Sequence, residues 1–262
     1  MHNFDFVKPA TIADAVKALA KDGAQALSGG QTLIPTMKQR LAEPEVLVSL
    51  TGIAEMKGVC PSAEGVAVGA ATTHSVVARD AAKHYPALAA LAGGIGDPAV
   101  RNRGTVGGSL ANNDPAACYP AGVLGSGATV VTNKRKIAAD DYFQGMFTTA
   151  LEDGEIITQV LFPVPQKAAY MKFNQPASRF ALTGVFVAKF ADHVRVAVTG
   201  ASEGGVFRWK EAEAALAKDF SAKAVEGLTV APKGMLSDLH GTAAYRANLV
   251  KVLTARAVTA SA

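Results

Sequence analysis

The chain has 262 residues, of which 49% are hydrophobic and 18% charged, and its formal net charge at pH 7 is +4. This composition is typical of a folded globular protein and excludes an intrinsically disordered chain. The sequence contains neither 18 consecutive apolar residues nor an N-terminal basic segment followed by an apolar one. We therefore expect no membrane span, no signal peptide and a cytoplasmic location.

Cysteine, histidine and basic residues limit the kinds of site that the chain can form. Its two cysteines, Cys60 and Cys118, cannot supply the four thiolates that ligate most iron–sulfur clusters, and their spacing does not favour a disulfide. The five histidines show no metal-ligand spacing, so we expect no metal site. The basic run at 133–136 lacks interleaved aromatic residues, which favours an exposed hairpin turn over nucleic-acid binding.

The first third of the chain alternates predicted helices and strands. Apolar residues recur at helical spacing after Thr11, a good capping residue. A second apolar pattern would bury Met37 and Leu41 on one helix face. The elements predicted here are a helix from Thr11 to Gly23, a strand at 24–27, a helix capped by Thr32 and a strand at 46–50.

A glycine-rich loop lies between the strand at 24–27 and the helix capped by Thr32. Its sequence, residues 27–33, is Leu-Ser-Gly-Gly-Gln-Thr-Leu. Paired glycines let main-chain N–H groups converge on an anion, and a strand–loop–helix turn points those groups at a phosphate. A plain turn is the alternative interpretation, because Gly-Gly is common between a strand and a helix.

A second glycine loop, residues 105–115, follows a short predicted helix that Asp97 caps and Gly104 closes. We expect it to be a long polar loop, and such loops between packed elements are more often functional. Arg101 and Arg103 beside it either add positive charge near a diphosphate or are surface charge. Two loops of similar composition indicate a ligand with two phosphates, held from two sides.

The remaining predicted elements follow from apolar runs and turn residues. Pro163 and Pro165 stop strand pairing and mark a domain boundary. The C-terminal helix carries a stripe of residues that we expect to face the core, namely Tyr245, Leu249, Val252, Leu253 and Arg256. The predicted strands are 65–71, 128–132, 156–162, 170–174, 183–190 and 194–199, and the helices are one capped near Thr73, then 85–92, 115–124, 210–218 and 243–258.

Neither glycine loop matches the GxGxxG or GxxxxGK[ST] fingerprint, which disfavours the usual nicotinamide-binding and ATP-binding folds. No nucleophile–base pair stands out either. Any reaction in which the chain takes part is therefore expected to be the chemistry of a bound cofactor.

Two segments carry a resemblance to a known family. They are GDPAVRNRGTVGGSLANNDPAACYPA, residues 96–121, and LSGGQTLIPTMKQRLAEPEVLVSL, residues 27–50. Weaker similarity continues through 140–163 and to YRANLVKVLTARAV near the C-terminus. The chain thus resembles, over essentially its whole length, the FAD-binding or medium subunit of the molybdenum hydroxylases, which include carbon monoxide dehydrogenase, xanthine dehydrogenase and aldehyde or N-heterocycle oxidoreductases.

The resemblance implies an α+β fold of the vanillyl-alcohol-oxidase (PCMH) type. Its expected parts are two α/β FAD-binding subdomains, at 1–54 and 55–164, and a C-terminal domain at 165–262 with a small antiparallel sheet and helices. FAD would lie in the cleft between these parts.

The resemblance also implies the residues that bind FAD. In the first loop they are Leu27, Ser28, Gly29, Gly30, Gln31, Thr32 and Leu33, and in the second loop Thr105, Val106, Gly107, Gly108 and Ser109. Beyond the loops they are Asp114, Cys118, Ile157, Lys172 and Phe180. Relatives usually carry aspartate where Cys118 stands, and an acid where Arg179 stands. We expect no catalytic residue and no metal ligand in this chain.

The function that the resemblance implies is electron transfer. A large partner subunit would oxidise the substrate at a molybdenum–pterin centre, and a small partner with [2Fe–2S] clusters would pass electrons to FAD here and on to an external acceptor. A dimer of heterotrimers is the expected assembly. The alternatives are a stand-alone flavin oxidoreductase of the same fold and a non-catalytic nucleotide-binding assembly protein.

Overall fold

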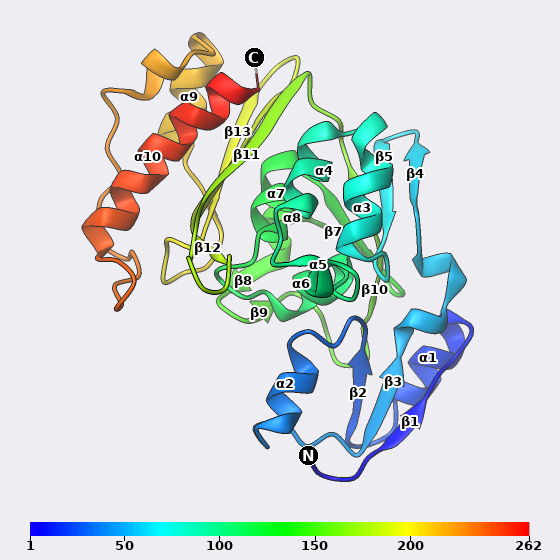
Figure 1. The fold of residues 1–262 in the computed structure, drawn as a ribbon. Helices are drawn as coiled ribbons and strands as arrows, with labels where there is room; N and C mark the ends of the chain where they lie inside the picture. Colours follow the sequence, from blue (N-terminus) through cyan, green and yellow to red (C-terminus); the bar gives the residue numbers. More distant parts are fainter. Residues whose placement is uncertain (262) are drawn as a thin grey trace.

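A computed structural model describes residues 1–261 and shows an α+β protein built around three sheets (Figure 1). The N-terminal sheet contains three parallel strands in the order β1-β3-β2. Parallel neighbours need crossover connections, and the helices between the strands supply them. The elements of this unit are β1 (Asp5–Val7), α1 (Ile12–Leu19), β2 (Ala24–Leu27), α2 (Leu33–Lys38) and β3 (Val46–Ser49).

The middle sheet contains five antiparallel strands in the order β4-β5-β10-β6-β7. Its strands are β4 (Val59–Ser62), β5 (Gly65–Gly69), β6 (Thr129–Thr132), β7 (Lys136–Ala138) and β10 (Ile157–Phe162). The intervening elements are α3 (His74–Asp80), α4 (Pro86–Gly93), α5 (Pro98–Arg101), α6 (Val106–Asn112), α7 (Tyr119–Ser126), α8 (Ala139–Tyr142) and the hairpin β8 (Phe143–Gly145) with β9 (Thr148–Thr149).

The third sheet is antiparallel and has the order β11-β12-β13-β14. Strand β12 (Ala181–Lys189) is buried on both faces. Phe186 packs in the core of the middle region, while Val185 and Val187 pack in the core under the C-terminal helices. This shared strand attaches the C-terminal region to the middle one. The elements are β11 (Lys167–Asn174), β12 (Ala181–Lys189), β13 (Val194–Thr199), β14 (Phe207–Arg208), α9 (Lys210–Lys218) and α10 (Ala243–Ala260).

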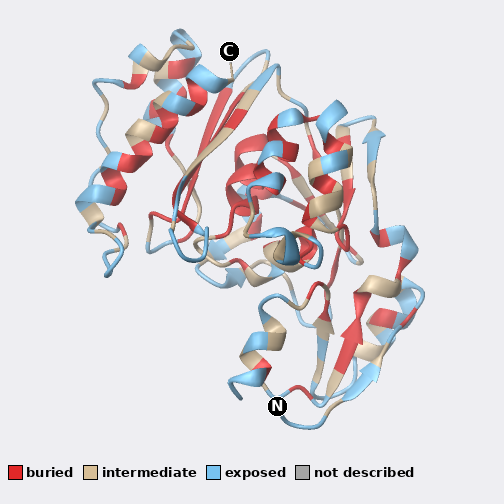
Figure 2. Cartoon of the chain, viewed as in Figure 1, coloured by how far each residue is buried: buried red, intermediate tan, exposed pale blue. Residues whose placement is uncertain are grey.

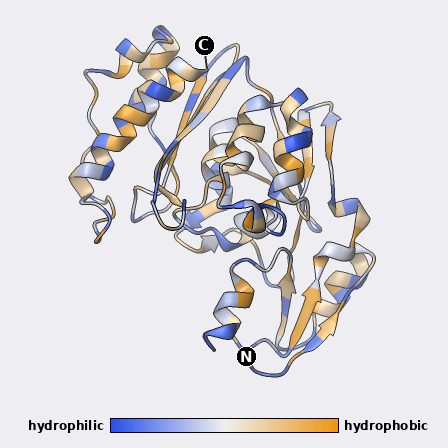
Figure 3. Ribbon diagram, in the orientation of Figure 1, coloured by the Kyte–Doolittle hydropathy of each residue, from blue (hydrophilic) through white to orange (hydrophobic). Residues whose placement is uncertain are grey.

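Burial and hydropathy follow this layered arrangement. The buried residues gather on β12 and β13 and on the helices that flank them, α7 on one side and α10 on the other (Figure 2). The N-terminal unit has a small cluster of its own, formed by Leu27, Met37 and Leu47. Strand β3 of that unit is mostly apolar (Figure 3), with Val46, Leu47 and Val48 followed by the buried Ser49.

Most of the predicted elements are present, and the differences have local causes. Residues 106–112 form a helix rather than a polar loop, because the Thr105 hydroxyl accepts from Gly108 N and begins α6. Thr32 precedes α2 but makes no capping hydrogen bond, and Leu41 is 74% exposed rather than buried. The core face of α10 is rotated from the predicted stripe, so that Tyr245 and Arg256 are exposed. Strand β4 and the β8–β9 hairpin were not expected.

The three sheets fall within the ranges 1–54, 55–164 and 165–262. The basic run at 133–136 forms the turn between β6 and β7, as predicted. Among the described residues, no helix is both long and apolar enough to cross a membrane. The division of the chain into three domains stays a prediction.

Candidate functional site

A cavity of about 600 Å³ runs between the three parts of the fold. One end, which we name the glycine end, is lined by Ser28–Thr32 of the first loop and by Thr105 and Gly107–Ser109. The other end, the hairpin end, is lined by Cys118, Ile157, Lys172 and Phe180. The fold therefore brings together the glycine loop after β2, the glycines at the start of α6, and residues from the β11–β12 hairpin, β10 and the start of α7.

The first loop offers free main-chain donors at the glycine end. The amides of Gly29, Gly30, Gln31 and Thr32 make no hydrogen bond to another main-chain group of the described chain. Gly30 has a φ of +71°, a conformation that glycine adopts without strain. A side chain on Gly29 would collide with the carbonyl of Arg103. Glycine is thus required here for both the turn and the close packing.

The second loop contributes differently from the prediction. We expected its amides to face the ligand, but Val106 N donates to Thr72 O at 3.2 Å and Gly107 N donates to Ala70 O at 2.8 Å. Val106 is fully buried and does not line the cavity, and its assignment as a cofactor-binding residue stays a prediction. The residues Gly107, Gly108 and Ser109 of this loop line the cavity.

The two loops contact each other directly. Ser28 Oγ lies 2.7 Å from Thr105 Oγ1, and the same Thr105 oxygen accepts from Gly108 N at 3.2 Å. One hydroxyl therefore joins the N-terminal unit to the start of α6. Arg101 and Arg103 do not line the cavity. Arg101 Nη1 instead donates to the carbonyls of Ile95 and Gly96, each at 3.0 Å, so its role is to hold the turn before α5.

Lys172 links three segments at the hairpin end of the cavity. Its Nζ donates to Gly94 O at 2.7 Å and to Arg179 O at 2.8 Å, and it lies 3.5 Å from Cys118 Sγ. Arg179 has a φ of +61°, an uncommon conformation for a residue with a side chain. Among the described residues, Lys172 and Arg179 are the cationic side chains that line the cavity, so positive charge is concentrated at this end.

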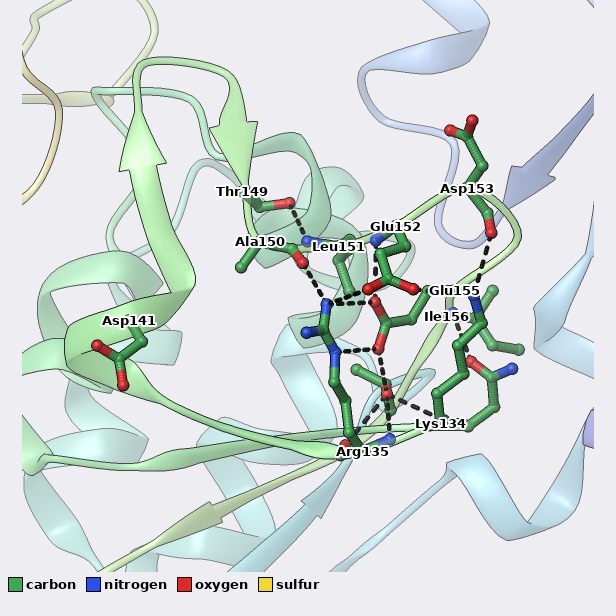
Figure 4. Close-up of polar contacts among 12 residues, drawn as sticks. Lys134, Arg135, Asp141, Thr149, Ala150, Leu151, Glu152, Asp153, Glu155 and Ile156 are labelled. Atoms are coloured by element: carbon green, nitrogen blue, oxygen red, sulfur yellow. Dashed lines mark hydrogen bonds and ion pairs between the residues drawn. The ribbon is translucent and has the colours of Figure 1, made fainter.

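An ion-pair cluster supports the wall at 151–157 (Figure 4). Glu155 accepts from Arg135 Nε and Nη2 at 3.1 Å each, from Thr132 Oγ1 at 2.6 Å and from Glu152 N at 2.9 Å. Hydrogen bonding to Arg135 is the main reason why the pKa of Glu155 falls to about 2. This segment leads directly into Ile156 and Ile157, which line the cavity.

The cavity lining contains the predicted site residues apart from Val106, together with residues that sequence reasoning missed. The missed residues include His74, Ile95, Gly96, Val100, Glu155 and Arg179's neighbour Ser178. The spacing of the five histidines, His74 among them, marks none of them as a ligand-binding residue. Among residues 1–261, no group of three or more His, Cys, Asp or Glu side chains could hold a metal ion.

The cavity and the residues that line it indicate the kind of ligand that the protein binds. Free loop amides, glycines at points of close approach and a cavity of about 600 Å³ are the features of a site for a phosphate-containing ligand of dinucleotide size. The protein is therefore of the dinucleotide-binding class, with a fold unlike the GxGxxG type.

Comparisons with known proteins specify the family. The family model for the FAD binding domain in molybdopterin dehydrogenase matches residues 2–165. The chain is 35% identical to the nicotine 6-hydroxylase medium subunit of Paenarthrobacter nicotinovorans, over 97% of this chain and 95% of that protein. It is 36% identical to the carbon monoxide dehydrogenase medium chain of Afipia carboxidovorans, over 98% and 96% of the two chains.

Solved structures agree with these sequence matches. Quinoline 2-oxidoreductase from Pseudomonas putida 86 aligns with a TM-score of 0.89 at 30% identity, over 99% of this chain and 97% of that one. The chain therefore belongs to the FAD-binding medium subunits of the molybdenum hydroxylases, and its cofactor is FAD. The PCMH-type fold and the family that the sequence resembled are confirmed.

Proposed function

We propose that the chain transfers electrons within a molybdenum hydroxylase complex. It accepts them on FAD from [2Fe–2S] clusters of a small partner subunit and passes them to an external acceptor, while a large molybdenum–pterin subunit oxidises the substrate. The observation that carries this proposal is the single cavity that joins both glycine loops to the hairpin end. Glu155, a carboxylate in the lining, is held by two hydrogen bonds from Arg135 and so has a structural role.

The cavity residues fit FAD. Four free amides at Gly29–Thr32 match the donors that a diphosphate needs, and the glycines of the second loop allow its close approach. We assign the diphosphate to the glycine end and the isoalloxazine ring to the hairpin end, beside Ile157, Lys172 and Phe180. Asp114 and Cys118 also line the cavity, Cys118 at the hairpin end.

FAD supplies the reversible uptake and release of electrons. The protein residues hold the cofactor and set the charge around it. The Lys172 ammonium is fixed by two carbonyls, at 2.7 and 2.8 Å, and so brings a localised positive charge to the hairpin end. A positive charge there favours the reduced ring, which gains negative charge.

The partners follow from the same proposal. The relatives are named as medium subunits or medium chains, names that imply at least two further subunits of different size. We propose a complex with one large and one small partner, assembled as a dimer of heterotrimers in the cytoplasm. Such a complex places neither a metal nor a substrate site in this chain.

Co-purification tests the proposal. The chain is tagged at one terminus and isolated from its native cells together with the proteins that bind it. The flavin, iron and molybdenum contents of the isolated material are then measured. The proposal requires a flavin absorption spectrum and two further chains carrying iron and molybdenum. A yellow chain that turns over substrate alone supports a stand-alone oxidoreductase, and a colourless chain that takes up no FAD supports an assembly protein; either result overturns the proposal.

A further inference from the structure

His74 is a buried residue that borders the cavity, and Nδ1 of its imidazole makes no hydrogen bond among the described residues. Its exposed fraction is 5%, and its side chain lines the cavity beside Gly104. Its backbone N–H donates to Gly104 O at 3.0 Å, which fixes the residue at the start of α3. Nδ1 is fully enclosed and has no partner within the described chain. A buried polar atom without a partner is uncommon and calls for an explanation.

The charge state of the ring follows from its surroundings. Burial, together with the positive charge of Arg101, lowers the pKa of His74 to about 4. The imidazole is therefore neutral at pH 7 and carries one N–H. Since Nδ1 is enclosed without an acceptor and orphaned N–H groups are rarer than orphaned acceptors, the proton belongs on Nε2.

The Nε2 edge of the ring is the edge beside Gly104. A Cβ placed on Gly104 would lie 2.5 Å from Nε2 and 2.9 Å from Cδ2 of His74. Gly104 in turn packs against Gly29, since a Cβ on Gly29 would lie 2.7 Å from Gly104 Cα. Nε2 is thus close to the glycine end of the cavity, where no cationic side chain lines the wall.

We propose that His74 is a further FAD-binding residue, whose Nε2–H donates a hydrogen bond to an oxygen of the cofactor near the glycine end. The proposal rests on the assignment of FAD to this cavity. The cofactor then supplies the acceptor for Nε2–H, and glycine at position 104 leaves room for the ring, because a Cβ there would lie 2.5 Å from Nε2. A diphosphate oxygen and a ribityl hydroxyl are the same kind of acceptor for this donor.

FAD affinity of His74 variants tests the proposal. The full chain is freed of flavin, refilled with FAD and titrated for the wild type, His74→Phe and His74→Gln. The phenylalanine variant should bind FAD about tenfold more weakly, the loss expected for one missing hydrogen bond, and glutamine should restore part of it. His84→Gln, at an exposed histidine, is the control. Equal affinity of wild type and His74→Phe overturns the inference, whereas a wild type that binds no FAD overturns the proposed function instead.

Two further measurements stand even if a His74 variant folds poorly. In nitrogen-15 NMR of the wild type, Nε2 should carry the proton, and its signal should shift when FAD is added. A proton on Nδ1, or an Nε2 signal that FAD leaves unchanged, contradicts the proposal. Gly104→Ala should weaken FAD binding by displacing the ring, and the same change in a His74→Ala background should have a clearly smaller effect; equal effects in both backgrounds would mean that position 104 acts independently of His74.

Discussion

Ser28 Oγ lies 2.7 Å from Thr105 Oγ1, so one hydroxyl pair joins the glycine loop after β2 to the loop that begins α6. The two residues are 77 positions apart: Ser28 follows strand β2, and Thr105 caps helix α6. The Thr105 oxygen also accepts from Gly108 N at 3.2 Å. The spacing of the two loops, and hence the width of the glycine end, depends on this contact.

Removal of this contact should weaken FAD binding. Ser28→Ala should raise the dissociation constant for FAD by about three- to tenfold, because one hydrogen bond of about 1 kcal/mol is lost. Thr105→Val should have a larger effect and should also lower the melting temperature, because it removes the cap of α6 as well. Fluorescence titration and thermal unfolding measure both quantities. Ser221→Ala, on the C-terminal surface, is the control, and an unchanged Ser28→Ala affinity would refute the role of the pair.

The two glycines of the second loop should differ on substitution. A Cβ on Gly107 would lie 2.6 Å from Ala70 Cβ, whereas a Cβ on Gly108 would lie 2.9 Å from the Thr105 hydroxyl and 3.7 Å from Ser28 Cβ. Gly107→Val should therefore mainly lower the stability of the fold, whereas Gly108→Val should mainly lower the amount of FAD that the protein retains. Flavin content and melting temperature of both purified variants separate the two effects. Full flavin occupancy in Gly108→Val would show that this part of the loop is only a turn.

Local signals in the sequence predicted much of the fold. Helices with strong caps or clear apolar spacing appear where expected, as at Thr11, Asp97 and 210–218. The second loop differs from the prediction because Gly-Gly is unfavourable in a helix. The Thr105 cap and the hydrogen bonds of Val106 N to Thr72 O and Gly107 N to Ala70 O stabilise helix there. The rotated face of α10 depends on Arg246, which is buried through bonds to Leu182 O and Gly200 O.

The glycine loops and the family resemblance predicted most of the residues that line the cavity. The prediction missed features that depend on contacts between distant parts of the chain. Gly29 and Gly30 could be chosen from the sequence because paired glycines have a known physical use. No sequence pattern shows that the Gly107 amide is already bonded to Ala70, or that His74 comes next to Gly104. Such facts depend on contacts between segments that are distant in the chain.

Acid should destabilise the protein in part through Glu155. Its pKa is lowered to about 2, so the carboxylate stabilises the fold fully above the ordinary value of 4.5 and loses this contribution as pH falls from about 4.5 to about 2. Glu155→Gln should lower the free energy of unfolding at pH 7 by about 2–3 kcal/mol. It should also make the free energy of unfolding depend less on pH below about 4.5. Urea unfolding between pH 7 and 3 measures this, with Glu203→Gln, at an exposed glutamate outside the cluster, as control. Parallel pH curves for wild type and Glu155→Gln would contradict the assignment.

Two buried tyrosines provide a matched pair. The Tyr85 hydroxyl lies 2.7 Å from Ser126 Oγ, whereas the Tyr119 hydroxyl is buried without a partner within the described chain. Tyr85→Phe should cost about 1 kcal/mol of unfolding free energy, and Tyr119→Phe should be neutral or stabilising by up to about 1 kcal/mol, because a buried unpaired hydroxyl is costly. Denaturant unfolding of the two variants checks the difference. A loss at Tyr119 as large as that at Tyr85 would mean that its hydroxyl has a partner, such as an ordered water molecule.

The charge at Lys172 should set the reduction potential of the bound flavin. Its Nζ is held by Gly94 O and Arg179 O, so Lys172→Met removes a fixed positive charge from the hairpin end. The reduced ring then loses a stabilising charge, and the two-electron midpoint potential should fall by about 30–60 mV, which corresponds to one or two powers of ten in the equilibrium constant. Lys172→Arg keeps the charge and should remain near the wild-type value, and Lys167→Met, at an exposed lysine on the same strand, is the control. Spectroelectrochemical titration of the flavin-loaded chain measures all four proteins. A potential that Lys172→Met leaves unchanged would show that this lysine only ties the β11–β12 hairpin to the end of α4.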